Sequence, residues 1–242
     1  MIQNCPCIIL AGGQGTRLKS VVQDRPKALA PVAGQPFLQH LLESLYAQGA
    51  RDVILSLHHQ AEMIEAFVAD WVTRPSDLKI RSVREPRPLG TGGAIRFVVQ
   101  ALKIHSAVFV TNGDTFLTTG FREMTEKIPA DFSANAIGLV QVPDASRFGK
   151  VECDNSGKIL RFQEKVSNAG PGWINSGIYF LQNSTVLQNQ QDEFSLEKVV
   201  FPQLVEQKTL RGISLDAQFI DIGIPSDYYA FENLFKTFKT QL

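Results

Sequence analysis

Apolar runs alternate with helix-like segments along the first half of the chain. Residues 7–11 (CIILA) form a continuous apolar run, which predicts a buried strand, and a glycine-rich loop follows it directly. From residue 37 to residue 48 the apolar positions recur at helical spacing, and Gly49 marks the end of that predicted helix. The same alternation predicts strands at 52–57, 78–83 and 107–111 and helices at 61–72 and 92–102. This order of elements is typical of parallel βαβ units.

The pattern changes after Gly120, where the chain predicts several strands with little helix between them. These strands are expected at 133–142, 150–153, 158–162 and 174–181, with a hairpin turn signal (DNSG) at 154–157. Further along, we expect a helix near 196–206, a strand pair around 210–222, and a last helix from Ser226 or Asp227 to about Phe238, introduced by Pro225.

Together these elements predict an α/β fold whose sheet is Rossmann-like, mixed but mainly parallel, and flanked by helices. Because the chain shows no internal repeat and no linker, residues 1–242 are expected to form a single domain. Its α/β half covers about 1–120 and shares its sheet with a more β-rich half, about 121–242. A functional crevice is expected at the carboxyl ends of the parallel strands.

Composition narrows the possible function classes. Hydrophobic residues make up 44% of the 242 positions and charged residues 20%, which excludes disorder, collagen-like repeats and coiled coils. The 24 Lys and Arg residues balance the 24 Asp and Glu residues, so no net positive charge favours nucleic acid. Without a membrane-length apolar run or a secretory signal, we expect no membrane association and a cytoplasmic location. The three cysteines suit reduced thiols there.

The loop after the first predicted strand has the composition of a polyphosphate site. Gly12, Gly13 and Gly15 allow the backbone to approach an anion closely, with unpaired N–H groups directed at it. Arg17 adds a forked cation, and Lys27, after Pro26, adds a second positive charge. The glycine spacing matches neither a P-loop nor a dinucleotide fingerprint, which disfavours a dehydrogenase.

The run GGQGTRL at 12–18, Pro26-Lys27 and the run PVAGQP at 31–36 resemble the signature of the sugar-1-phosphate nucleotidyltransferases. Segments 20–27 and 31–38 are most similar to the D-glycero-α-D-manno-heptose 1-phosphate guanylyltransferase branch of that family. The resemblance extends over nearly the full length. It implies a GT-A-like fold, in which the first half binds the nucleotide and the second half binds the sugar phosphate.

The resemblance also implies a set of nucleotide-binding residues, in which the second glycine-rich segment, 89–94, lines the base pocket. This set is Leu10, Ala11, Gly12, Gly13, Gly15, Thr16, Leu89, Gly90, Thr91 and Gly113. Glu85 stands near the position where thymidylyl and uridylyl relatives tend to have glutamine. Because a carboxylate only accepts hydrogen bonds, it suits the N1–H and N2–H₂ donors of guanine, and we hypothesise that Glu85 selects GTP.

Two aspartates are candidates for a magnesium site. Asp114 follows an apolar strand, and Asp221 lies within a second apolar context, FIDIG at 219–223. Mg²⁺ beside a nucleoside triphosphate takes few protein ligands and completes its octahedron with phosphates and water. By resemblance, Asp114 and Asp221 are the metal-binding pair.

For the sugar phosphate, the resemblance implies Gly149, Glu164, Lys165 and Asn175, of which Lys165 would pair with the phosphate. The run Ser195-Leu196-Glu197 reads as a helix N-terminal cap, although heptose-type relatives carry a similar segment near the sugar. Both interpretations of that run stay open.

The expected enzyme transfers GMP from GTP to D-glycero-α-D-manno-heptose 1-phosphate and releases pyrophosphate, in a pathway of surface glycan synthesis. Arg17, Lys27 and Asp114 are the expected catalytic residues. Alternatives are a UTP- or dTTP-dependent hexose-1-phosphate enzyme, cytidylyl transfer to an amino-alcohol phosphate, and a non-catalytic nucleotide-sugar-binding regulatory subunit. The intact charged residues disfavour the last of these. The sequence leaves a monomer and a homodimer equally open.

Overall fold

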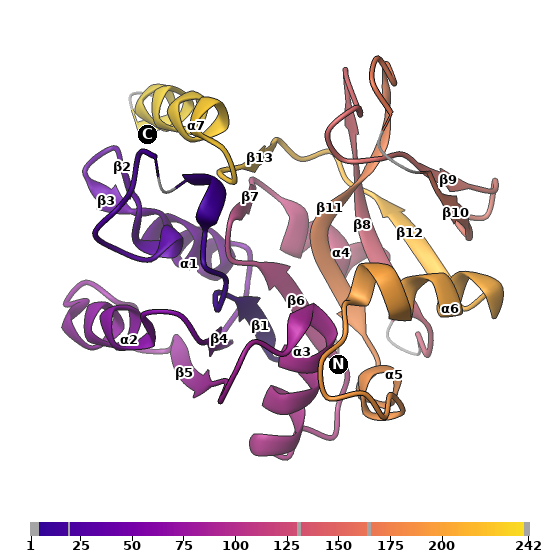
Figure 1. Cartoon of the computed structure of the whole chain (residues 1–242), viewed down its shortest axis with the longest axis horizontal. Coiled ribbons are helices and arrows are strands. Elements are labelled where there is room, and N and C mark those ends of the chain that lie inside the picture. The colour runs from indigo at the N-terminus through magenta and orange to yellow at the C-terminus, as the bar shows by residue number, and fades with distance from the viewer. Residues whose placement is uncertain (1–4, 19, 130–131, 164–165, 240–242) are drawn as a thin grey trace.

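A single seven-stranded sheet runs through the molecule in the order β12-β8-β11-β6-β1-β4-β5 (Figure 1). The computed structural model describes residues 5–18, 20–129, 132–163 and 166–239. The strands of the sheet are β1 (Cys7–Leu10), β4 (Asp52–Leu57), β5 (Lys79–Arg84), β6 (Val108–Asn112), β8 (Asn135–Val142), β11 (Gly172–Leu181) and β12 (Leu210–Ser214).

Six of these strands run in one direction and β11 runs against them. β1 pairs in parallel with β4 and β6, β4 pairs in parallel with β5, and β8 pairs in parallel with β12. β11 is antiparallel to both of its neighbours, β6 and β8. The carboxyl ends of six strands therefore share one edge of the sheet with the amino end of β11. This arrangement confirms the predicted mixed, mainly parallel sheet.

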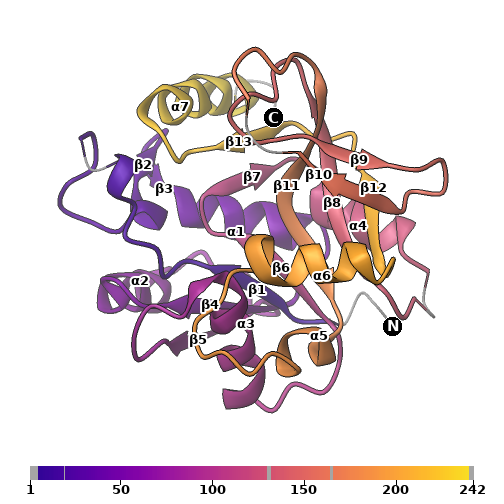
Figure 2. The same ribbon diagram turned by 45° about the vertical axis from the view of Figure 1, so that its right-hand side comes forward.

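Helices cover both faces of the sheet because both faces of its central strands are apolar (Figure 2). Along β1, Cys7 and Ile9 belong to one buried cluster, which includes residues of α1, α4 and α7. Ile8 points the other way, into a second cluster with residues of α3, α5 and α6. The helices are α1 (Phe37–Ala47), α2 (Ala61–Asp70), α3 (Gly90–Ala101), α4 (Gly120–Lys127), α5 (Asn183–Leu187), α6 (Phe201–Glu206) and α7 (Pro225–Lys239).

Short elements complete the fold and position loops at the carboxyl edge. Two 3₁₀ turns, η2 (Thr16–Leu18) and η3 (Lys27–Leu29), follow β1, and one π-helical turn, η4 (Leu196–Val200), precedes α6. Three antiparallel ladders join β2 (Pro31–Val32) with β3 (Gln35–Pro36), β7 (Thr115–Leu117) with β13 (Phe219–Asp221), and β9 (Val151–Cys153) with β10 (Ile159–Phe162). The β9–β10 hairpin confirms the turn signal, because Asp154 accepts hydrogen bonds from the amides of Ser156 and Lys158.

Some sequence expectations need correction. The predicted strand pair at 210–222 is wrong in its pairing, because β12 joins β8 in the main sheet whereas β13 joins β7. The predicted helix at 196–206 is divided into η4 and α6. Pro202 lacks the N–H that an unbroken α-helix would use there. β7, α4 and α5 were not predicted.

The described residues contain no helix that is long and apolar enough to cross a membrane. The cysteines Cys5, Cys7 and Cys153 are free thiols.

Close packing of the β1 and β6 ends makes a matched test of the fold possible. A Cβ atom on Gly113 would lie 2.5 Å from the carbonyl oxygen of Leu10 and 3.1 Å from the Cα of Ala11, whereas one on Gly13 would meet nothing within 4 Å. We therefore expect Gly113→Ala to lower the free energy of unfolding by about 1–3 kcal/mol and Gly13→Ala to change it by less than about 0.5 kcal/mol. Urea unfolding of both variants measures the difference, and equal effects would contradict this packing.

Candidate active site

The loop after β1 and the end of β6 meet at the carboxyl edge of the sheet. The amide of Gly113 donates a hydrogen bond to the carbonyl oxygen of Leu10 at 2.9 Å, and the amide of Ala11 donates to the carbonyl of Ser56 at 2.9 Å. A hollow of about 160 Å³ opens here, which we call the first hollow. It is lined by Leu10, Ala11, Gly13, Gly15, Thr16, Arg17, Lys27, Ala28, Gly113, Asp114 and Gly223. The predicted polyphosphate loop and both predicted cations are therefore brought together.

Lys27 lies beside two carboxylates in this hollow. Its Nζ atom donates a hydrogen bond to Oδ2 of Asp114 at 2.6 Å and lies 4.0 Å from Oδ1 of Asp221. The lysine side chain is only 11% exposed, whereas that of Asp114 is 35% exposed, so the ion pair is shielded on the lysine side and open to solvent on the Asp114 side. Gly15 has a φ of +58°, and a Cβ atom there would stand 2.9 Å from Cβ of Lys27. Glycine at this position lets the loop cross the lysine closely.

The two aspartates meet because β7 and β13 pair. Asp221 stands opposite Thr115 in this ladder, and the amide of Ile222 donates to the backbone carbonyl of Asp114 at 2.9 Å. Burial and the nearby Asp114 charge raise the pKa of Asp221, while Lys27 and Arg17 act in the opposite direction. The structure thus confirms that these carboxylates are neighbours, which is the geometry expected of the proposed metal pair.

The residues present fit a hard divalent cation. Asp114 and Asp221 offer oxygen donors, and a cation near them would oppose the burial and the Asp114 charge that raise the pKa of Asp221. Within residues 5–18, 20–129, 132–163 and 166–239, no group of three or more His, Cys, Asp or Glu side chains is placed to hold a metal. Two carboxylates suit an ion that keeps several water or phosphate ligands.

A second hollow of about 350 Å³ adjoins the first. The two share Leu10, Gly13 and Asp114, so they form one cleft along the end of the sheet. The remaining residues of the second hollow are Gly12, Glu85, Pro88, Leu89, Gly90, Thr91, Ala94, Asn112 and Glu197. The predicted second glycine-rich segment therefore borders the same cleft as the first, at the start of α3.

Glu85 is a buried carboxylate in the second hollow, with 9% of its surface exposed. Ser56 donates its hydroxyl to Oε1 at 2.9 Å, and the amide of Leu89 donates to Oε2 at 3.3 Å. Burial raises the pKa of Glu85 above that of an ordinary glutamate, and these two hydrogen bonds oppose the shift. The carboxylate is therefore held in one orientation before any ligand binds.

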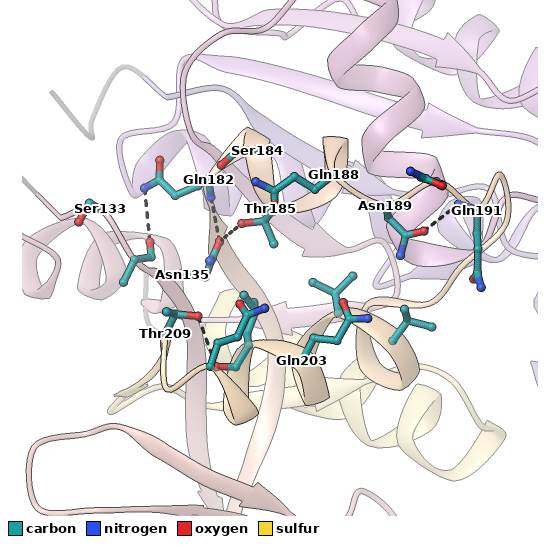
Figure 3. Close-up of a pocket in the computed structure, with 16 residues that line it drawn as sticks. Ser133, Asn135, Gln182, Ser184, Thr185, Gln188, Asn189, Gln191, Gln203 and Thr209 are labelled. Atoms are coloured by element: carbon teal, nitrogen blue, oxygen red, sulfur yellow. Dashed lines mark hydrogen bonds between the residues drawn. The ribbon is translucent and has the colours of Figure 1, made fainter.

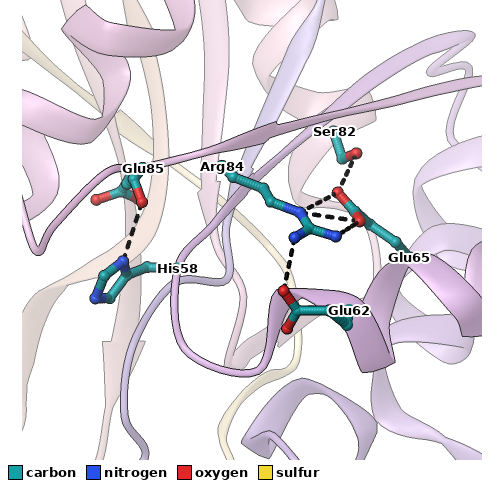
Figure 4. A network of polar contacts seen from close by, with 6 residues as sticks. All are labelled: His58, Glu62, Glu65, Ser82, Arg84 and Glu85. Atoms are coloured by element: carbon teal, nitrogen blue, oxygen red, sulfur yellow. Dashed lines mark hydrogen bonds and ion pairs between the residues drawn. The ribbon is translucent and has the colours of Figure 1, made fainter.

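Strand alternation directs Glu85 toward the cleft. In Figure 4 the neighbouring Arg84 points away from Glu85, into an ion-pair network with Glu62 and Glu65 of α2. The ring of His58 lies on the Glu85 side, with Nδ1 3.1 Å from the Glu85 carbonyl oxygen. This contact ties the end of β4 to the segment that carries Glu85.

The residues predicted to bind the sugar phosphate do not gather in the cleft as the predicted nucleotide-binding residues do. Asn175 lies near the amino end of β11, where its Nδ2 donates to the hydroxyl of Tyr179 at 3.1 Å and its Oδ1 accepts from the amide of Gly177 at 2.9 Å. Gly149 lies in the loop before β9 and donates its amide to Ala145. Neither Asn175 nor Gly149 lines either hollow as described. Glu164 and Lys165 lie outside the described residues.

Several residues of the cleft were missed by sequence reasoning. Asn112 and Glu197 both line the second hollow. Asn112 could have been found, because it ends β6 two positions before Asp114. For Glu197 the available signal was the similarity of the run 195–197 to a segment near the sugar in heptose-type relatives. In the structure its carboxylate accepts a hydrogen bond, at 2.9 Å, from Thr91, which is far away in the sequence.

The cap interpretation of Ser195 is confirmed. Its Oγ accepts hydrogen bonds from the amides of Glu197 at 3.1 Å and Lys198 at 3.2 Å, which satisfies the start of η4. The same turn also borders the cleft through Glu197, so the two interpretations of this run do not exclude each other.

Comparison with known proteins identifies the family of this chain. The family model described as Nucleotidyl transferase matches residues 7–237. The D-glycero-alpha-D-manno-heptose 1-phosphate guanylyltransferase of Campylobacter jejuni is 38% identical over 228 residues, covering 93% of this chain and 97% of that protein. The protein of the same name from Aneurinibacillus thermoaerophilus is 35% identical over 223 residues, covering 91% and 94%.

Among solved structures, HddC from Yersinia pseudotuberculosis, complexed with GMP-PN, superposes with a TM-score of 0.82 at 36% identity and covers 96% of this chain and 99% of its own. A glucose-1-phosphate thymidylyltransferase from Bacillus anthracis, described as putative, shares the fold at a TM-score of 0.81 and 19% identity, covering 95% and 94%. The family model spans almost the whole chain and the relatives match end to end, so this chain belongs to the nucleotidyl transferase family.

Proposed function

We propose that the protein transfers GMP from GTP to D-glycero-α-D-manno-heptose 1-phosphate, giving the GDP-sugar and pyrophosphate. The observation that carries this proposal is the match to two heptose 1-phosphate guanylyltransferases over more than nine-tenths of the chain. A phosphate oxygen of the sugar attacks the α-phosphorus of GTP, and the bond from that phosphorus to the bridging oxygen of pyrophosphate breaks. The site holds the charged groups that this displacement requires.

The nucleophile is already an anion, so the reaction needs no general base. The difficulty is to hold two phosphate-bearing substrates in line against their mutual repulsion. Arg17 and the amides of the glycine loop would bind the triphosphate, and Lys27, in the same hollow, would stabilise the charge that develops on the α-phosphate. Asp114 and Asp221 would hold Mg²⁺, which supplies electrophilic stabilisation of the phosphates when bound.

Base selection is assigned to Glu85. Each carboxylate oxygen has about two acceptor positions, and Ser56 and Leu89 each occupy one. The remaining positions would accept from the N1–H and N2–H₂ groups of guanine. Uracil and thymine present one such donor and two carbonyl oxygens, and the oxygens would be repelled. This is why we favour GTP over UTP or dTTP.

The sugar phosphate would be bound from the second half of the chain, with Gly149, Glu164, Lys165 and Asn175 as the proposed residues. We treat residues 1–242 as one catalytic domain, because the main sheet draws strands from both halves of the chain. We place the reaction in the cytoplasm, where GTP is available, and assign its product to surface glycan synthesis.

Replacing Lys27 tests the electrostatic role directly. We expect Lys27→Ala to lower kcat by about 10²–10³-fold, the usual effect of losing one group that stabilises developing charge. Lys79→Ala is the matched control, since Lys79 is an exposed lysine on the edge strand β5. Pyrophosphate release from GTP and heptose 1-phosphate is the assay, and a Lys27→Ala enzyme as fast as the control would refute the role.

Metal dependence has its own test. Chelation with EDTA is expected to abolish pyrophosphate release, and added Mg²⁺ to restore it. Asp221→Asn should raise the Mg²⁺ concentration needed for half the maximal rate by at least about 10-fold, the scale of losing one supporting group at a metal site. Asp216→Asn is the control, because Asp216 is exposed on the same connection between β12 and β13. Identical Mg²⁺ curves for the two variants would argue against Asp221 as a ligand.

Nucleotide choice is tested by Glu85→Gln together with pH. We expect the substitution to lower the ratio of kcat/KM for GTP over that for UTP by about 10-fold or more, because one acceptor becomes a donor. In the unmodified enzyme the ratio should also fall as acid protonates Glu85. Because burial raises the pKa of this group, the fall should begin at a higher pH than for an ordinary glutamate. Glu62→Gln, at an exposed position of α2, is the control. A Glu85→Gln enzyme with an unchanged preference for GTP would contradict the proposal that Glu85 selects the base.

A further inference from the structure

The largest hollow described lies away from the catalytic cleft, between α5, α6 and the start of β8 (Figure 3). Its volume is about 550 Å³, against about 160 and 350 Å³ for the two hollows of the cleft. It lies at the far end of β11, where Leu181 pairs with Val108 at the beginning of β6. Asp114 follows the opposite end of β6, so the sheet separates the two places. We call this hollow the amide pocket.

The lining of the amide pocket is polar but uncharged. Amide and hydroxyl side chains dominate it, among them Asn135, Gln182, Thr185, Gln188 and Gln203, and none of the described residues that line it is Asp, Glu, Lys, Arg or His. A phosphorylated or otherwise ionic ligand therefore finds no opposite charge here. Amides carry both donors and acceptors, which is the complement of a hydroxyl-rich neutral molecule.

Asn135 carries an oriented donor into this pocket. The side chain is 5% exposed, and its Oδ1 accepts hydrogen bonds from the amide of Gln182 at 3.0 Å and the hydroxyl of Thr185 at 2.9 Å. Because the backbone N–H of Gln182 can only donate, Oδ1 of Asn135 must face it. Nδ2 of Asn135 therefore faces away from Gln182, into the pocket (Figure 3). Among the described residues, none accepts a hydrogen bond from Nδ2. Nδ2 therefore offers a donor on the wall of the pocket.

The opposite wall supplies further free groups and an apolar surface. The side chains of Gln188 and Gln203 are exposed and make no hydrogen bond to any described residue. Between the amides lie Val199, Val200 and Leu204. Alternating hydrogen-bonding groups with a small apolar patch match the two aspects of a sugar ring, its hydroxyls and its C–H face.

We propose that the amide pocket is a second binding site, for an uncharged saccharide of one or two sugar units. Its volume lies within the range of about 300–1,000 Å³ that is typical of small-molecule sites. Arg96 is not among the residues that line the pocket, and its guanidinium donates to the backbone carbonyl of Asn189 at 2.6 Å and pairs with Asp192. The proposal does not depend on the catalysed reaction, because it concerns neutral ligands at the other end of the sheet.

Saturation-transfer difference NMR on the full chain tests this site, with D-mannose and maltose as neutral probes and glucuronate as the charged probe. We expect both neutral sugars to give transfer signals and glucuronate to give none. Gln203→Trp, at an exposed position of α6, would fill the pocket and weaken binding by at least about 10-fold, equivalent to about 1.4 kcal/mol. Gln141→Trp, exposed on β8 at the catalytic end of the sheet, should bind as the unmodified protein does.

Two controls distinguish binding in the amide pocket from binding in the catalytic cleft. The neutral sugars should still bind to the Lys27→Ala variant, and added GTP with Mg²⁺ should not displace them. Full binding by Gln203→Trp, displacement by GTP, equal binding of glucuronate, or no signal from either neutral sugar at millimolar concentration would each overturn the proposal. Loss of catalysis in Lys27→Ala with sugar binding retained would support both sites separately.

Discussion

The ion cluster of Lys27, Asp114 and Asp221 is the interaction on which the arrangement of the cleft depends. Three chain segments meet there only because parallel strands end at one edge and the β7–β13 ladder returns the chain to the same place. One ammonium and two carboxylates meet there, and Arg17 lines the same hollow. A divalent cation bound at the two carboxylates would make the cluster more attractive to a polyphosphate.

This constraint explains which parts of the structure could be anticipated. The central parallel strands were predictable because residues buried on both faces read as continuous apolar runs, as in Cys7 to Leu10. The glycine loop was predictable because its spacing is local. The pairing of β7 with β13 was not, since the chain between Leu117 and Phe219 carries no local sign of it. Pro202 was visible in the sequence, but its effect on the predicted helix was overlooked.

The candidate site divides in the same way. Lys27 and the glycine loop both come soon after β1 in the sequence, and both belong to the family signature. Glu197 lines the cleft beside Thr91, from a helical turn whose sequence left both a cap and a position near the sugar open. Glu85 was proposed from its position near the glutamine of relatives and from its chemistry, while its hydrogen bonds to Ser56 and Leu89 depend on how β4, β5 and α3 lie together. The sequence shows which residue types are available for the site, whereas the fold is needed to show how their side chains are oriented toward one another.

The reversed direction of β11 brings its amino end to the edge where the other six strands of the sheet have their carboxyl ends. Glu85 follows a strand at its carboxyl end, while Asn175 lies near the amino end of β11, next to a break in its register with β8. The residue proposed to select the base and the residue proposed to bind the sugar thus belong to different backbone segments at one edge of the sheet. If both assignments hold, a lineage of this fold could exchange its nucleotide while keeping its sugar, or the reverse.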